Sequence, residues 1–379
     1  MSQTTDKLLF NNLHFLNQDE WEIINQSNFY KLIAGSETKP FSKKNVFIIF
    51  SDHLGDDRDF LSCDLEHKPH ERLIQIIQDN PDQNFYVFCG ILNFHQIEKT
   101  YPNVKIIHWA DEMFVISNCH YTEILPQREK NFDSKKHWIS VSQNKRIPRY
   151  LVGMYLLGEN LDRTGLLRFD PSELLEHDSW DSYVSYWKYN DREKEIAQLL
   201  SCSSSFKKGF YKVKNKQGYE SNQYRGPTDP ETAYLNIEKY HKNFDLFLKP
   251  LYKNSFIEIV IETVVFQKYG LITEKFLNSV YGFNLPILLG VPGSIAHLKS
   301  IGFDMFDSVI DYSYESIIDP IPRLIHALDR NKELLQNSEL AKLAWKKCLP
   351  GLEHNFQLAQ EIERNLESSF NTQLLDILK

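Results

Sequence analysis

Short apolar segments of strand length recur along this chain and alternate with segments of helical character. Three of them lie in the first third, at Val46 to Phe50, Phe85 to Cys89 and Val104 to His108. Each is rich in β-branched or aromatic residues and is bounded by polar or turn-forming residues, as strands are. Between the first two, the segment HERLIQIIQDNPD favours a helix that ends near Asn80 and Pro81. This alternation predicts βαβ units with parallel strands.

A second series of the same kind begins near the middle of the chain. We expect a strand from Lys135 to Ser142, a helix from Arg149 to Leu157 that stops at Gly158, and buried strands at Ser255 to Val265 and Leu285 to Leu289. Further helices are expected at Thr273 to Tyr281, after Asp319-Pro320 and along the tail from about Leu335.

The chain has 379 residues, more than one ordinary core accommodates, so two domains are expected. The interpretation is an N-terminal α/β domain over 1–133, a second α/β domain over 134–330 and a helical tail over 331–379. An irregular insertion is expected at about 161–250, where the basic run FKKGFYKVKNKQ is interpreted as a solvated loop. The predicted fold class is α/β, with two Rossmann-like domains facing across a cleft and a C-terminal helical tail.

Composition narrows the class of protein. The formal net charge of −8 argues against a broad, positively charged binding surface for nucleic acid. Five cysteines without a CxxC pair favour reduced thiols in a cytoplasmic protein, with neither a disulfide framework nor a zinc site. The N-terminus lacks the pattern of a signal peptide, and no run approaches the ~20 apolar residues of a membrane span. Peripheral contact with a membrane is compatible with this composition.

An acid and a base adjoin at the expected start of the helix at Thr273, as Glu274 and Lys275. Backbone N–H groups and the helix dipole favour an anion at that place. Lys275 could reach a diphosphate, and Glu274 could accept hydrogen bonds from a ribose diol. The alternative is a simple capping arrangement with Lys275 in solvent. A glycine turn at Gly290 and Gly293 follows the next strand and would allow close approach of a ligand.

A second cluster of cations follows the strand that ends at Ser142. Lys145, Arg146 and Arg149 lie within five residues, and guanidinium groups match phosphate oxygens in a bidentate way. Together with Lys275 they would surround a leaving diphosphate, as a transfer without a metal requires. The alternative is a set of surface charges on a loop.

These two segments resemble the donor-binding domain of the α-1,3-fucosyltransferase family. The first resemblance is carried by Trp138, Ser142, Asn144, Arg146 and Tyr150. The family then has F-E-N, Y-V-T-E-K and a strand P-V-x-x-G. This chain has Ile261-Glu262-Thr263, Leu271 to Lys275 and Pro286 to Gly290.

The resemblance implies a GT-B glycosyltransferase that needs no metal or other cofactor. Arg146 and Lys275 would hold the diphosphate, Glu274 the ribose, and Glu262 would line the donor site. The full expected donor-binding set is Asn144, Arg146, Arg149, Glu262, Tyr269, Thr273, Glu274, Lys275 and Gly290. Thr263 and Leu271 replace the family's Asn and Tyr, and the link between the motifs is two residues longer, so the base and the sugar of the donor stay open.

A sugar transfer also needs a group that deprotonates the acceptor hydroxyl. The acidic loop after the first strand offers Asp52 and Asp57, and Glu112 follows the third strand. The loop also contains the D-x-D pattern Asp57-Arg58-Asp59, which in other transferases binds a metal with the diphosphate. A solvated acidic loop is the plain alternative.

The expected function is transfer of a sugar from a nucleoside diphosphate sugar to a hydroxyl of a glycan, of the lipopolysaccharide or surface polysaccharide type. One alternative is transfer to a hydroxylated base in DNA, which only the basic segment Lys207 to Lys216 favours. An alternative of another class is a non-catalytic α/β binding protein.

Overall fold

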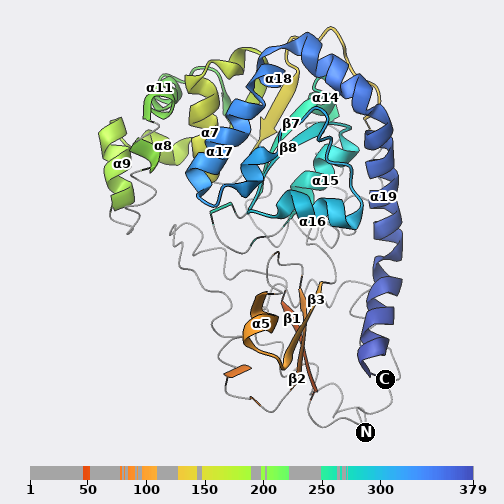
Figure 1. The fold of residues 1–379 in the computed structure, drawn as a ribbon. Helices are drawn as coiled ribbons and strands as arrows, with labels where there is room; N and C mark the ends of the chain where they lie inside the picture. The colour runs from red at the N-terminus through yellow and green to blue at the C-terminus, as the bar shows by residue number, and fades with distance from the viewer. Residues whose placement is uncertain are drawn as a thin grey trace.

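The described residues form an α/β structure with two parallel sheets (Figure 1). The computed structural model describes residues 46–51, 77–78, 81, 84–89, 92, 96–108, 127–142, 147–188, 198–200, 203–221, 249–262, 265–266, 270 and 272–378. Among these, no helix combines the length and the apolar character needed to cross a bilayer.

The first sheet has three strands in the order β1-β2-β3. They are β1 (Val46–Ser51), β2 (Asn84–Cys89) and β3 (Val104–His108), and both pairs are parallel. The short helix α5 (Ile97–Thr100) precedes β3 and buries Ile97. The three strands predicted in the first third are therefore confirmed, and residues 77 and 78 of the predicted intervening helix are helical.

The second sheet has five parallel strands in the order β6-β5-β4-β7-β8. Their bounds are β4 (Trp138–Val141), β5 (Gly165–Phe169), β6 (Glu220–Ser221), β7 (Ile257–Ile261) and β8 (Leu285–Leu289). The order of the strands reverses at β4, so the chain leaves β4 and β7 at a topological switch point. Ligands of open parallel sheets bind at such a point.

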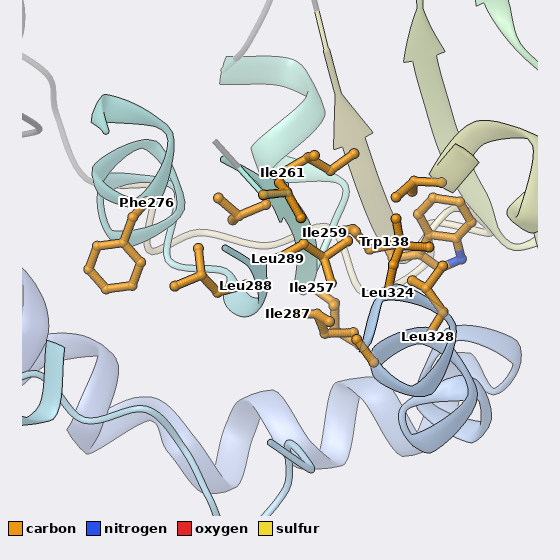
Figure 2. Packing of buried hydrophobic residues seen from close by; sticks show 14 of the residues in the cluster. Trp138, Ile257, Ile259, Ile261, Phe276, Ile287, Leu288, Leu289, Leu324 and Leu328 are labelled. Atoms are coloured by element: carbon orange, nitrogen blue, oxygen red, sulfur yellow. The ribbon is translucent and has the colours of Figure 1, made fainter. Parts of the chain in front are cut away.

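Every residue of β7 and β8 is buried, as a sheet with covered faces requires. Figure 2 shows Ile257 and Ile259 of β7 in this core together with Leu324 and Leu328 of α17 (Pro320–Arg330). The burial of these apolar side chains on both faces stabilises the sheet through the hydrophobic effect.

The basic run Phe206 to Gln217 is a helix and not the expected loop. It forms most of α11 (Ser203–Lys214), which packs against α7 (Ile147–Gly158). Phe206, Phe210 and Val213 recur at helical spacing and are fully buried, while the lysines lie on other faces. Because lysines stand between these apolar residues in the sequence, the composition of the run favoured a loop over an amphipathic helix.

Residues 161–250, expected to be irregular, contain β5, β6 and several helices. The helices with described bounds are η3 (Leu161–Arg163), α8 (Ser172–Glu176), α9 (Trp180–Lys188), α11 and α14 (Lys249–Lys253). Trp180 and Tyr183 of α9 pack against Phe210, with ring centroids 6.0 and 5.8 Å away. The described residues of this segment therefore form an integral layer around the second sheet.

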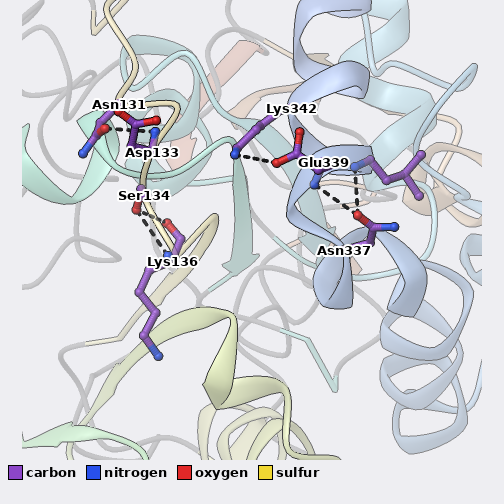
Figure 3. Close-up of polar contacts among 8 residues, drawn as sticks. Asn131, Asp133, Ser134, Lys136, Asn337, Glu339 and Lys342 are labelled. Carbon is purple, nitrogen blue, oxygen red and sulfur yellow. Dashed lines mark hydrogen bonds and ion pairs between the residues drawn. The ribbon is translucent and has the colours of Figure 1, made fainter.

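The C-terminal part is helical, as predicted from the sequence. After α15 (Glu274–Tyr281) and α16 (Ser294–Ile301), the chain forms η5 (Ser313–Ser316), α17, α18 (Lys332–Gln336) and α19 (Ser338–Leu378). At the start of α19, the side-chain oxygen of Asn337 accepts the backbone N–H groups of Glu339 and Leu340 at 3.1 Å each (Figure 3). Figure 1 shows α19 passing along the elements of the second sheet and continuing beyond them.

Two kinds of contact tie the first part of the chain to the second. The Leu92 N–H donates to the Gly270 carbonyl at 2.8 Å, between β7 and α15. The Lys130 ammonium donates to the carbonyls of Tyr252 and Gly282 and to Asn284 Oδ1, at 2.6 to 2.7 Å. Burial lowers the pKa of Lys130, and the charge of Glu258 acts in the opposite direction.

Candidate functional site

A buried carboxylate marks the carboxyl end of β7. Glu262 follows the strand directly and is 1% exposed. Its Oε2 accepts hydrogen bonds from the Thr273 hydroxyl at 2.6 Å and from the Thr273 backbone N–H at 3.2 Å. Its Oε1 is buried without a hydrogen-bond partner. A buried acceptor left in this state is expensive, and such an atom suits a ligand that donates a hydrogen bond.

Thr273 is the N-cap residue of α15, as predicted, but its side chain does not cap the helix. The hydroxyl instead donates to Glu262 and accepts from the Lys275 ammonium at 2.8 Å. Thr273 therefore links the end of β7 to the first turn of α15 and orients both charged groups.

Glu274 and Lys275 form an ion pair at the start of α15. The Lys275 Nζ lies 2.9 Å from Glu274 Oε1, and about a fifth of each side chain is exposed, 21% and 22%. Burial acts to raise the pKa of Glu274, but the positive charge of Lys275 and its hydrogen bond, with a smaller effect of Arg149, hold the pKa below its usual value. Glu274 is thus ionised at neutral pH, and both side chains of the pair are reachable from solvent.

Arg149 belongs to the same site although it comes from another element. It is the third residue of α7, is 3% exposed, and lies within electrostatic reach of Glu274. The first turns of α7 and α15, the helices that follow β4 and β7, therefore lie near each other, as expected at a switch point. The sequence analysis expected Arg149 and Lys275 in one site, and the structure brings their charges together at Glu274.

Burial also raises the pKa of Glu262, to about 7, against the effects of the Lys275 charge and the Thr273 hydrogen bond. Glu258, four residues earlier on β7, accepts the Tyr252 hydroxyl at 3.1 Å, and burial raises its pKa to about 8. Two carboxyl groups on one buried strand therefore carry protons near neutral pH.

We expect this proton on Glu262 to give stability a defined pH dependence. The folded protein holds it between the usual pKa of 4.5 and about 7, where the unfolded chain releases it, so stability falls as the pH rises through that window. Glu262→Gln cannot lose a proton, so the wild type should lose on the order of 2–3 kcal/mol relative to this variant between pH 4.5 and 8. Urea unfolding across this pH range measures the difference.

Glu274→Gln is the matched control, because the pKa of the neighbouring Glu274 carboxyl is shifted in the opposite direction, downward. The stability that ionised Glu274 contributes to the wild type should be present above the usual pKa and should be lost as the pH falls. Parallel pH curves of the wild type and Glu262→Gln would contradict the assignment of a buried proton to Glu262.

Gly290 follows β8 at the same edge of the sheet. A methyl group there would lie 2.5 Å from Ser294 Oγ and 3.8 Å from Glu262 Cγ. The Ser294 hydroxyl donates to the Val291 carbonyl at 2.7 Å. The close approach expected at Gly290 therefore exists, and a side chain of the protein itself makes it.

The start of α16 already holds a carboxylate of the protein. Gly293 has a left-handed φ of 92°, and the N–H groups of Gly293 and Ile295 donate to Glu315 Oε2 at 2.9 and 3.3 Å. Sequence reasoning missed Glu315, because nothing in the local pattern links it to a turn about 20 residues earlier. A shallow groove of about 710 Å³ lies beside it, between α16 and residues 307–316. Neither Glu274 nor Lys275 lines this groove, which is a separate feature.

Several predicted site residues lie outside the described residues. They are the candidate bases Asp52, Asp57 and Glu112 and the donor-binding candidates Asn144, Arg146 and Tyr269. Within the described ranges, no cluster of three or more His, Cys, Asp or Glu side chains is placed to hold a metal ion.

Comparison of the chain with protein-family models, with curated proteins and with solved structures gives no match. The geometry and chemistry of the residues around Glu262, Glu274 and Lys275 are therefore the basis for assigning a function.

Proposed function

We propose that the second domain binds a nucleoside diphosphate sugar and that the chain is a glycosyltransferase acting on a glycan hydroxyl. The observation that supports this best is the site at the switch point, where Glu262, the Glu274–Lys275 ion pair and the charge of Arg149 converge. Such a ligand carries both anionic phosphates and hydroxyl donors, and this site has cations beside carboxylates.

The ion pair suggests how the donor binds. Lys275 is held by Glu274 and Thr273 in the absence of ligand. A diphosphate can replace Glu274 as the partner of Lys275, with Arg149 adding positive charge, because charge-assisted bonds to phosphate oxygens are strong. Glu274 is then released to accept hydrogen bonds from the ribose diol. Glu262 Oε1, buried and without a hydrogen-bond partner, then bonds a further hydroxyl of the donor, as acceptor when the carboxyl is ionised and as donor when it carries a proton.

In the transfer one bond forms, one bond breaks and one proton is transferred. The acceptor oxygen forms a bond to the anomeric carbon while the bond from that carbon to the diphosphate breaks, and the acceptor proton passes to a base. Positive charge at Lys275, Arg149 and Arg146 stabilises the leaving diphosphate without a metal. We place the base on the N-terminal domain, at Asp52, Asp57 or Glu112, with the two domains facing across a cleft in the GT-B manner. The acceptor is a lipopolysaccharide or surface polysaccharide glycan.

Titration calorimetry with GDP-, UDP- and CMP-sugars tests donor binding. We expect one class to bind and Lys275→Ala to weaken it about 10- to 100-fold, the effect of losing one charge-assisted hydrogen bond of about 1.5–3 kcal/mol. Lys299→Ala is the matched control, because Lys299 lies in the same domain and pairs with Asp307 at 2.7 Å. Its affinity should equal that of the wild type.

The donor proposal is wrong if none of these sugars binds, or if Lys275→Ala binds as well as the wild type. Binding without release of free nucleoside diphosphate on incubation with glycan acceptors would instead favour a non-catalytic binding protein.

A further inference from the structure

Arg168 lies on the half-open face of β5. Gly165, Leu167 and Phe169 of this strand are buried, whereas Leu166 and Arg168, on the opposite face, are half-buried. The Arg168 Nε is buried without a hydrogen-bond partner, and the guanidinium forms no ion pair with the residues that the structure describes. A buried donor in this state is unfavourable, and a guanidinium group matches a carboxylate or a phosphate in a bidentate way.

The parallel register places Arg168 beside the proposed donor site. Arg168 pairs with Val141 of β4, and Ile139, two residues earlier on β4, pairs with Glu258 of β7. Register partners lie on one face of a sheet, as do residues two apart in a strand, so Arg168, Glu258 and Glu262 share a face. Two strand spacings, about 10 Å, separate Arg168 from β7, and Glu262 lies one two-residue step nearer the carboxyl edge.

The charged groups along this edge follow the order of the parts of a donor molecule. In the proposed function, Glu274 binds the ribose, and Lys275 and Arg149 bind the diphosphate. These residues come from the helices that follow β7 and β4, and the next strand in the sheet is β5. The part of a nucleoside diphosphate sugar that lies beyond the diphosphate is the sugar. We therefore expect the sugar at the carboxyl end of β5, where Arg168 lies.

We propose that the donor sugar is acidic, of the uronic acid class, and that Arg168 binds its carboxylate. This inference rests on the proposed function and specifies the sugar that the proposed function leaves open. The carboxylate of a uronic acid accepts two parallel N–H···O bonds from a guanidinium group, whereas a neutral sugar leaves the positive charge unpaired.

Two further polar groups follow β5 at the same place. The carboxylate of Asp170 accepts the Ser172 backbone N–H at 2.9 Å, and the Ser172 hydroxyl is buried without a hydrogen-bond partner. Carboxylate and hydroxyl groups are the usual hydrogen-bond partners of sugar hydroxyls. The end of β5 therefore offers a cation for the sugar's carboxylate and polar groups for its hydroxyls.

Titration calorimetry with matched donors tests the proposal on the full chain. UDP-glucuronic acid and UDP-glucose differ only at C6, which is a carboxylate in the first and a hydroxymethyl group in the second, as do GDP-mannuronic acid and GDP-mannose. For the base that the site accepts, we expect the acidic donor to bind at least about tenfold more tightly, the effect of one charge-assisted hydrogen bond. Arg168→Gln should reduce this preference to within about twofold.

Arg163→Gln is the matched control, because Arg163 is exposed on η3 just before β5 and its loss should leave the full preference. Circular dichroism confirms that both variants are folded, and the comparison of the two donors on the wild type needs no variant. If both donors bind equally and Lys275→Ala weakens both, the acidic-sugar inference is wrong while the proposed function stands. If no nucleotide sugar binds, both are wrong. A preference that persists in Arg168→Gln overturns the assignment to Arg168.

Discussion

Replacing Gly209 with alanine should lower the free energy of unfolding by about 2–3 kcal/mol, the cost of overpacking a core. Helices α7 and α11 approach so closely that a methyl group at Gly209 would lie 1.8 Å from the Met154 carbonyl oxygen and 2.5 Å from its carbon. Both atoms belong to the backbone of α7 and cannot rotate away, so the helices must separate. The higher helix propensity of alanine offsets at most about 1 kcal/mol of this loss of stability.

Gly153→Ala is the matched control on the same helix pair. Its methyl group would meet the Phe169 ring at 3.0 Å, and a side chain can shift where a backbone cannot. We expect a change within about 1 kcal/mol. Urea unfolding followed by circular dichroism measures both variants. Equal stability of Gly209→Ala and the wild type would show that α7 and α11 are not packed this closely.

Arg323→Met should be more destabilising still, by about 3–5 kcal/mol, because three carbonyls lose a charged donor and each buried group left unsatisfied costs about 1–3 kcal/mol. Arg323 is 2% exposed on α17. Its guanidinium donates to the carbonyls of Ile317, Ile318 and Val265 at 2.9, 2.8 and 2.6 Å. Burial lowers its pKa to about 10, so it stays charged at neutral pH. Methionine would leave three carbonyls without this donor.

The same variant should weaken donor binding, because Val265 lies three residues after Glu262. Arg330→Met is the control, since Arg330 is exposed at the end of the same helix and its loss should cost within about 0.5 kcal/mol. Thermal unfolding and calorimetry with a bound nucleotide sugar give the two readings. If the Arg323→Met protein is as stable as the Arg330→Met protein, the hydrogen bonds from Arg323 to Val265 and the other two carbonyls do not stabilise the fold as stated.

The sequence was most informative about where elements lie. The strands β7 and β8 were predictable because an apolar run of strand length has few alternatives to burial within a sheet. The start of α15 at Thr273 was predictable because that residue type favours an N-cap position. These signals act over a few residues and do not depend on distant parts of the chain.

The sequence was misleading at the basic run. Phe206, Phe210 and Val213 already had the spacing of a buried helix face, but the lysines between them favoured a loop by composition. The helix is stabilised by packing against α7, whose backbone lies very close to Gly209. Whether this segment forms a buried helix or a solvated loop therefore depends on contact with residues that lie about 50 positions earlier in the chain.

The sequence by itself therefore determined the α/β class, the positions of its main strands and helices, and the acid–base pair at Glu274 and Lys275. Only the tertiary structure decided that Thr273 binds Glu262 instead of capping its helix, that Arg149 acts on Glu274, and that Glu315 occupies the start of α16. The physical reason is range. Strand and helix preferences depend on neighbouring residues, whereas hydrogen bonds and charge interactions depend on distances that exist only after the chain has folded.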